Sequence, residues 1–149
     1  SRVLSTLGWG RYCERHGGMR AMRYGLTLGG IALTIVACFP FLANAFWSAG
    51  IPTYAAWLFG GAFIIEGLAL AAQQVGSNSY LYQVAPDDQI PTYFGLANTV
   101  MGPFYFLPAL AGALLNIVGY QVIFAFAAVF LFGGSIMTLG QIALAKKKG

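Results

Sequence analysis

The sequence has 149 residues, of which 58% are hydrophobic and 8% are charged, with a formal net charge of +4. Eight basic and four acidic side chains cannot cover the surface of a water-soluble domain of this length, so composition excludes an ordinary soluble protein and predicts an integral membrane protein. The basic residues sit only near the two ends of the chain. That placement argues against a nucleic-acid-binding surface and is typical of flanks that set membrane orientation.

Two long stretches of the chain carry no charged residue. One separates Arg23 from Glu66, and the other separates Asp88 from Lys146. Each stretch is roughly twice the ~20 residues that one helix needs to cross a bilayer, so each predicts two spans. We therefore expect an all-α membrane protein with four transmembrane helices. An even number of spans returns both basic ends to one side, which places both in the cytoplasm of a multi-pass protein of the plasma or inner membrane.

The N-terminal part predicts a cytoplasmic loop followed by the first span. Residues about 9–23 are polar and glycine-rich, which favours a loop, and the span covers about 24–43. Gly25 and Gly29 have the small-xxx-small spacing that lets helices approach closely. Cys13 and Cys38 are expected to be free thiols. Because the chain opens with Ser1 and has no signal-peptide pattern, we expect a fragment or a processed chain.

The second span is predicted over about 54–75, after an uncharged turn at 44–53 that is rich in aromatic residues. Glu66 lies about twelve positions inside this span, at a depth of ~18 Å, which is close to the middle of the membrane. Gln73 follows seven residues later on the same helix face, so the two side chains are expected to line one polar strip.

The third span is predicted over about 92–115, after a proline-containing break at 84–91, with Pro103 and Pro108 expected to bend it. Steps of three and four residues place polar and small residues on one stripe of this helix, which is expected to face protein: Asn98, Gly102, Tyr105, Ala109, Gly112 and Asn116. The fourth span covers about 121–145 and precedes three lysines.

Glu66 has two competing interpretations. An ionisable residue inside a membrane span usually faces a bundle interior or a wet cavity, often on a substrate or proton pathway. The alternative is a protonated side chain that makes one interhelical hydrogen bond. Gln73, Asn98 and Tyr105 are the other candidate pathway residues, because the second and third spans carry most of the polar side chains.

Catalytic signatures are weak in this sequence. It contains neither a zinc-binding HExxH pattern nor a phosphate-binding GxxxxGK[ST] pattern, and its single histidine, His16, lies in the predicted loop. Asp87 and Asp88 are the only aspartates, so a Ser-His-Asp set cannot be assembled convincingly. We expect no enzyme activity, no metal site and no cofactor. An intramembrane enzyme that uses Glu66 would need a second catalytic group near it.

Two stretches resemble the major facilitator superfamily of secondary transporters. Gly10, Glu14, Arg15 and Gly17 are similar to the family's cytoplasmic G-x-x-x-[DE]-R-x-G motif, although Arg20 alone remains of the basic residues that usually follow. The stretch 86–124 is similar to the eleventh helix and the turn into the twelfth, through Pro86, Tyr93, Phe94, Gly95, Leu96, Ala97, Asn98, Gly102, Pro108, Gly112, Gly119, Tyr120 and Phe124.

The resemblance implies that the four spans are helices nine to twelve, within the C-terminal six-helix half of a transporter. It also implies alternating access around a midplane site, a small-molecule substrate, and partners in the lipid bilayer and in the N-terminal helices of a longer chain. The competing hypothesis is a noncatalytic four-helix membrane protein that oligomerises or scaffolds partners through its small-residue faces.

Overall fold

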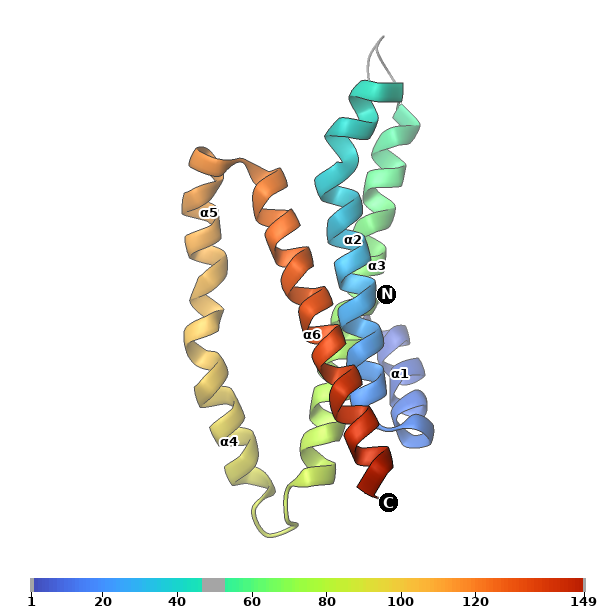
Figure 1. The fold of residues 1–149 in the computed structure, drawn as a ribbon, viewed down its shortest axis with the longest axis vertical. Coiled ribbons are helices and arrows are strands. Elements are labelled where there is room, and N and C mark those ends of the chain that lie inside the picture. The colour runs from blue at the N-terminus through green and yellow to red at the C-terminus, as the bar shows by residue number, and fades with distance from the viewer. Residues whose placement is uncertain (1, 47–52, 149) are drawn as a thin grey trace.

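The computed structural model describes residues 2–46 and 53–148, and every regular element within those ranges is a helix (Figure 1). In chain order these are α1 (Arg2–His16), α2 (Gly18–Phe46), α3 (Thr53–Val84), α4 (Ile90–Met101), the short 3-10 helix η1 (Gly102–Phe106), α5 (Leu107–Val118) and α6 (Tyr120–Lys148). The predicted all-helical fold is confirmed. Most of the predicted turn at 44–53 lies outside the described residues.

Three helical stretches of the described chain are long and apolar enough to cross a membrane: Gly18–Ala43, Ile90–Leu115 and Tyr120–Ala143. They correspond to the first, third and fourth predicted spans. α3, the second predicted span, is not among them. α3 is nevertheless 32 residues long, which gives a length of about 48 Å.

The segment 9–23, predicted as a loop, is helical except at Gly17, so that expectation needs correction. Its polar residues are compatible with a helix whose outer face is exposed, as at Arg11, Glu14 and Arg15, while Cys13 on the inner face is buried. Gly17 has a φ of 86° and donates its N–H to the carbonyl of Cys13 over 2.8 Å. This left-handed glycine ends α1 and lets the chain turn into α2.

The centre of the bundle is formed by α2, which packs against α3 on one side and α6 on the other. Most of the residues buried between these three helices are alanines, which allow the helices to approach closely: Ala21 and Ala32 of α2, Ala62, Ala69 and Ala72 of α3, and Ala128 of α6. α1 packs against the beginning of α2 and the end of α3 (Figure 1). The same end of the bundle holds the α3–α4 turn and the end of α6.

The third predicted span forms a separate arm made of α4, η1 and α5. Pro103 and Pro108 stand in the first turns of η1 and α5, and the residues between them wind as a 3-10 helix. A proline lacks the N–H that an α-helix needs at this position, which explains the local change of winding and agrees with the predicted bend.

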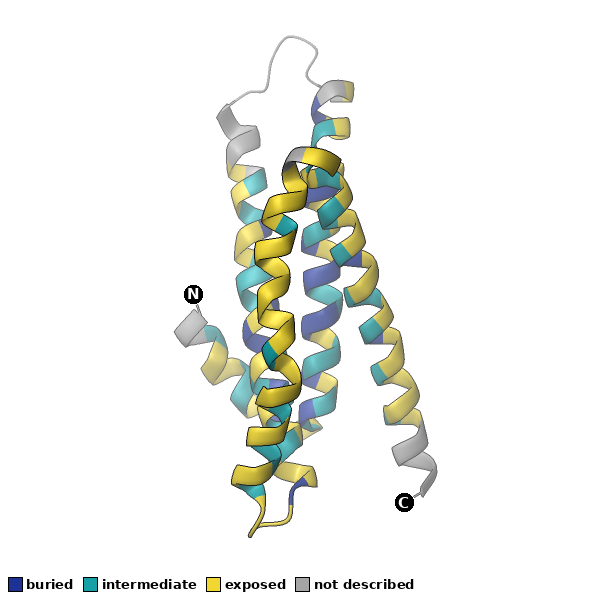
Figure 2. Cartoon of the chain, turned by 90° about the vertical axis from the view of Figure 1, so that its left-hand side faces the viewer, coloured by how far each residue is buried: buried dark blue, intermediate teal, exposed yellow. Residues whose placement is uncertain are grey.

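This arm buries none of its side chains against the rest of the described chain, and almost all of its surface is exposed in Figure 2. Tyr105 is 73% exposed, and Phe104 and Leu107 are 57% and 53% exposed. The expectation that the Asn98–Tyr105 stripe packs against protein while Phe104 and Leu107 face lipid is therefore not met within this chain. Both faces of the arm are open, because only its ends contact α3 and α6.

Candidate functional site

Glu66 lies near the middle of α3, about 20 Å along the helix from Thr53. Its side chain points at Gly29 of α2: a Cβ atom placed on Gly29 would lie 3.3 Å from Glu66 Oε2. The same position would lie 3.1 Å from Leu131 Cδ1 of α6 and 3.4 Å from Gln73 Nε2. Gly29 therefore marks the point where α2, α3 and α6 meet, and the carboxyl of Glu66 occupies the space that a side chain at this position would fill.

Gln73 shares this interface with Glu66, as their spacing predicts. Its Nε2 donates a hydrogen bond to the carbonyl oxygen of Gly25 over 3.2 Å, joining α3 to α2. A Cβ on Gly25 would lie 2.8 Å from the carbonyl oxygen of Ala69 and 2.8 Å from the backbone nitrogen of Gln73. The two backbones thus approach closely at Gly25, where an ordinary side chain would not fit.

One oxygen of Glu66 has no partner in this interface. Oε2 is buried and accepts or donates no hydrogen bond within the described chain. A buried carboxylate without a partner is costly to keep charged, so such a group is suited to holding a proton or to meeting a ligand that supplies the missing partner. The amide of Gln73 lies beside it and already binds the Gly25 carbonyl.

α6 closes the interface with a second polar contact. The hydroxyl groups of Thr27 and Ser135 are 2.8 Å apart, and Thr27 also donates to the carbonyl of Arg23 over 2.9 Å, which makes Ser135 the donor to Thr27. Phe132 covers Gly30, where a Cβ would lie 2.9 Å from the ring. In the sequence, Thr27 and Ser135 are polar residues on largely apolar spans, and nothing in their spacing predicts that they meet.

The closest crossing of α2 and α3 was also missed by sequence reasoning. A Cβ on Gly18 would lie 2.5 Å from the carbonyl oxygen of Gly76, and one on Gly76 would lie 2.5 Å from the backbone nitrogen of Met22. Gly18 precedes Gly25 by seven residues, and Gly76 follows Ala69 by seven. That shared spacing was the available signal, because positions seven apart lie on one face of a helix.

The other candidate pathway residues do not join this group. Asn98 lies on α4 and Tyr105 on η1, and both side chains are exposed. η1 contacts only α4 and α5, so the structure keeps Tyr105 apart from the α2–α3 interface. Gly102 and Gly112, expected to pack against a neighbouring helix, have open space where a Cβ would stand.

The four residues of the predicted loop motif all belong to α1 and its end. Gly10 is half-buried, Glu14 and Arg15 are exposed, and Gly17 provides the turn into α2. They lie near the end of α3 and not at the Glu66 site. Within the described residues, no three His, Cys, Asp or Glu side chains come close enough together to hold a metal ion.

Comparison with known proteins adds no relative to this description: no family model, no curated protein and no solved structure matches the chain.

Proposed function

We propose that all four long helical segments cross the membrane. α3 would then be a span in addition to the three apolar stretches described above. α3 runs antiparallel to α2, with close backbone approaches from Gly18 and Gly76 to Gly25 and Ala69, and the Glu66 side chain reaches Gly29 beyond them. A helix packed this closely against a membrane-spanning helix over several turns shares its depth. Glu66 would then lie inside the bilayer. Both ends of the chain would lie on one side of a plasma or inner membrane, in the cytoplasm.

Two engineered cysteines test this topology, in a background with Cys13 and Cys38 replaced by serine. Arg20 precedes most of α2, and Asp88 lies in the turn after α3. If α3 crosses the membrane, Arg20→Cys and Asp88→Cys are labelled by an impermeant maleimide from the same side. Labelling from opposite sides would show that α3 does not cross.

We further propose that the chain is part of a secondary active transporter that moves a small solute by alternating access, with Glu66 as a proton-coupling residue. The observation that carries this proposal is the buried, unpartnered Oε2 of Glu66 where α2, α3 and α6 meet. Intramembrane carboxyl groups in such positions serve proton relays and substrate pathways in transporters. The half-buried Gln73, hydrogen-bonded to the Gly25 carbonyl, adds a polar neighbour on the same helix face.

The exposed arm supports the further proposal that the chain is one part of a larger helical assembly. Asn98 and Tyr105 present polar groups on a surface that α2, α3 and α6 leave uncovered. Polar side chains on a span usually face protein and not lipid, because lipid offers them no hydrogen-bond partner. The major facilitator arrangement would supply such helices, with the four spans as its helices nine to twelve.

Proton-coupled uptake tests the role of Glu66. The full-length protein is reconstituted in vesicles with a trapped pH-sensitive dye, and a panel of small solutes is added under an imposed proton gradient. We expect at least one solute to drive proton movement with the wild type and none with Glu66→Gln, because the amide keeps the size of the side chain but cannot release a proton. Asp88→Asn makes the same chemical change at an exposed position and should transport normally. Proton-coupled uptake by Glu66→Gln would remove the coupling role.

The alternative function, a noncatalytic scaffold or oligomer, is favoured by one observation: the α4–α5 arm is exposed on both faces and carries many exposed apolar side chains. A scaffold of this kind would associate through the arm and would move no solute. Chemical crosslinking from single cysteines at positions 100 and 110, combined with the uptake assay, separates the two functions. Intermolecular crosslinks without solute-dependent proton movement would favour the scaffold.

A further inference from the structure

The outer face of α1 carries two arginines that no other described residue neutralises. Arg11 and Arg15 are four residues apart, so they lie on one face of the helix, and both are exposed. Neither forms an ion pair within the described chain. Glu14 is the only acidic residue among the first 65 residues, against five arginines in the same stretch, and it is also exposed.

Arg11 and Arg15 line an open hollow of about 340 Å³ together with Gly8, Tyr12 and His16. Tyr12 supplies the largest ring that lines this hollow. Its ring stacks on His16 with centroids 4.5 Å apart, and it meets Trp9 edge-on at 5.7 Å. Gly8 leaves one wall without a side chain. The hollow therefore offers two guanidinium groups and an imidazole around an aromatic surface.

The ring of Tyr12 is anchored to α2. Tyr12 contacts Tyr24 edge-on at 5.8 Å and is hydrogen-bonded to it, and the charge of Arg20 acts on Tyr12 as well. Burial and this hydrogen bond raise the pKa of Tyr12, whereas the positive charge of Arg20 opposes the rise. Tyr12 therefore stays a neutral phenol, and the hollow keeps its positive charge.

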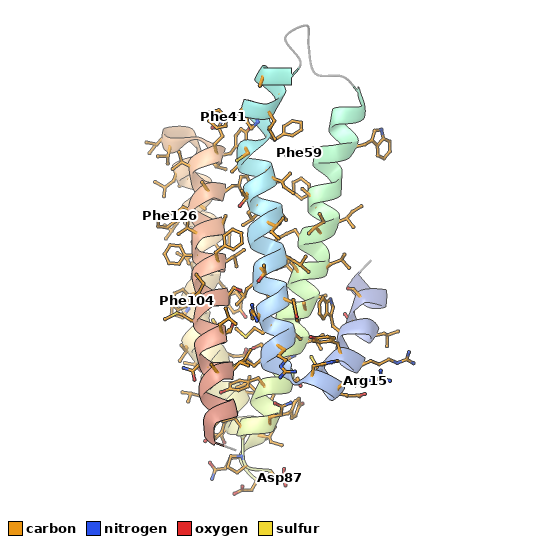
Figure 3. The ribbon with its side chains drawn as sticks, turned by 45° about the vertical axis from the view of Figure 1, so that its right-hand side comes forward. Arg15, Phe41, Phe59, Asp87, Phe104 and Phe126 are labelled. Carbon is orange, nitrogen blue, oxygen red and sulfur yellow. The ribbon has the colours of Figure 1, made fainter. Side chains whose placement is uncertain are left out.

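The hollow lies beside the start of the first membrane-spanning stretch, which begins at Gly18. α1 runs from partway along the bundle toward the end where the α3–α4 turn lies (Figure 1), and Arg15 is found toward the same end as Asp87 in Figure 3. Trp9, Tyr12 and Tyr24 are aromatic residues of the kind that collects at the headgroup level. If α2 crosses the membrane from Gly18, as proposed above, the two arginines stand near the boundary between hydrocarbon and water.

The outer face of α1 changes from apolar to basic along this direction. Leu7 precedes Arg11 by four residues, which places it about one turn nearer the start of α1, and it is 68% exposed. Leu7, Arg11 and Arg15 therefore form one line with an apolar inner end and two positive charges at the outer end. This order matches a phospholipid, whose acyl chain lies inside the membrane and whose phosphate lies at its surface.

We propose that Arg11, Arg15 and His16 bind the phosphate of an anionic phospholipid, with Tyr12 beneath the headgroup and Leu7 against an acyl chain. Guanidinium groups suit this role because they form paired hydrogen bonds with phosphate oxygens. Bound lipid would cover the exposed outer face of α1 and join this helix to the membrane beside α2.

Trp9 provides the reporter for a test in the full chain. Trp47 and Trp57 are replaced by phenylalanine, and the protein is reconstituted in phosphatidylcholine vesicles that contain a minor fraction of lipid with brominated chains. Brominated phosphatidylglycerol should quench Trp9 more strongly than the same fraction of brominated phosphatidylcholine. Each of Arg11→Gln and Arg15→Gln should weaken this preference about fivefold, the change expected from about 1 kcal/mol per basic residue near an anionic surface.

Two further variants separate the hollow from diffuse charge and from misfolding. The double variant Lys147→Gln, Lys148→Gln removes two positive charges from the end of α6 and should keep the preference. The double variant Arg11→Lys, Arg15→Lys keeps the positive charge and should retain most of the preference for phosphatidylglycerol. Equal quenching of Trp9 by the two lipids in the wild type would overturn the proposal. The proposal would also fail if the lysine-to-glutamine control lost as much of the preference for phosphatidylglycerol as the Arg11→Gln and Arg15→Gln variants. Abolition of the preference by excess inorganic phosphate would assign the hollow to a soluble anion and would also overturn it.

Discussion

Gln73 and Gly25 are joined by a hydrogen bond of 3.2 Å from the side-chain amide of α3 to the main-chain carbonyl of α2. This contact is possible only because Gly25 has no side chain, since a Cβ there would lie 2.8 Å from Gln73 Cγ. The polar contact and the close packing therefore depend on the same glycine. Two turns away on α3, the Glu66 side chain fills the space beside a second glycine, Gly29, without a hydrogen bond from its Oε2.

We expect Gly25→Ala and Gly76→Ala to destabilise the bundle by about 1–3 kcal/mol each, the range found when extra atoms are forced into a packed core. In both cases the added Cβ meets backbone atoms of the facing helix, which cannot move without separating α2 from α3. Gly133→Ala is the matched control, because nothing lies within 4 Å of its Cβ position. Unfolding in detergent micelles, followed by circular dichroism, measures the differences. Equal stability of Gly25→Ala and Gly133→Ala would contradict the close crossing.

Gly29→Ala should cost less than Gly25→Ala. Its Cβ would meet only side-chain atoms of Leu131, Glu66 and Gln73, at 3.1–3.4 Å, and these ends can shift by a few tenths of an ångström. The shift would nevertheless move the Glu66 carboxyl. We therefore expect a small loss of stability in the unfolding assay and a clear change in the proton-coupled uptake assay. A variant that is as unstable as Gly25→Ala would show that the Glu66 side chain is held rigidly.

The Thr27–Ser135 contact should contribute about 0.6 kcal/mol to the packing of α6 on α2, the average for interhelical hydrogen bonds in membranes. Ser135→Ala and Thr27→Val each remove one partner, and Thr27 keeps its bond to the Arg23 carbonyl when Ser135 is replaced. A double-mutant cycle with the two variants isolates the coupling between the hydroxyls. A coupling energy of zero would mean that the two groups find other partners.

Gly17→Ala should loosen α1 from the bundle, because its φ of 86° is a conformation that costs other residues roughly 1–2 kcal/mol. No atom lies within 4 Å of the Cβ position, so the cost is confined to the backbone. Gly17→Asn, which tolerates this conformation better, is the control. The rate of maleimide labelling at Cys13, which is 4% exposed, reports the opening of α1. The rate should rise more in the alanine variant than in the asparagine variant.

Alkaline pH should weaken the same docking of α1. Burial raises the pKa of the Cys13 thiol, and the hydrogen bond with Ser79 only partly opposes this effect. A thiol whose pKa is higher in the folded protein keeps its proton up to a higher pH there than in the unfolded chain. Its contribution to stability is therefore complete below the unfolded pKa of about 8.5 and is lost as pH rises above it. Cys13→Ser should flatten this part of the pH–stability curve, and an unchanged slope would contradict the assignment.

The sequence by itself determined where most of the long helices lie and which residues are unusual within them. The charge-free stretches at 24–65 and 89–145 each have room for two long helices, and this arithmetic placed the helices near their observed limits. It also identified Glu66 as an ionisable group in an apolar helix, and its seven-residue spacing to Gln73 placed the two on one face, where the structure finds both at the α2–α3 interface. The prediction of a loop at 9–23 from its polar residues was wrong, because a helix with an exposed outer face carries as many charges as a loop.

Only the tertiary structure decided which helix faces meet. Gly25 and Gly29 contact α3, whereas Gly102 and Gly112, in a similar sequence setting, face open space. The stripe through Asn98 and Tyr105 likewise has no neighbour among the described helices. The physical reason is that lipid is as apolar as a leucine side chain, so hydrophobicity does not distinguish a face that packs against protein from one that faces lipid. Shape and hydrogen bonding between partners make that distinction, and these appear only when the helices are brought together.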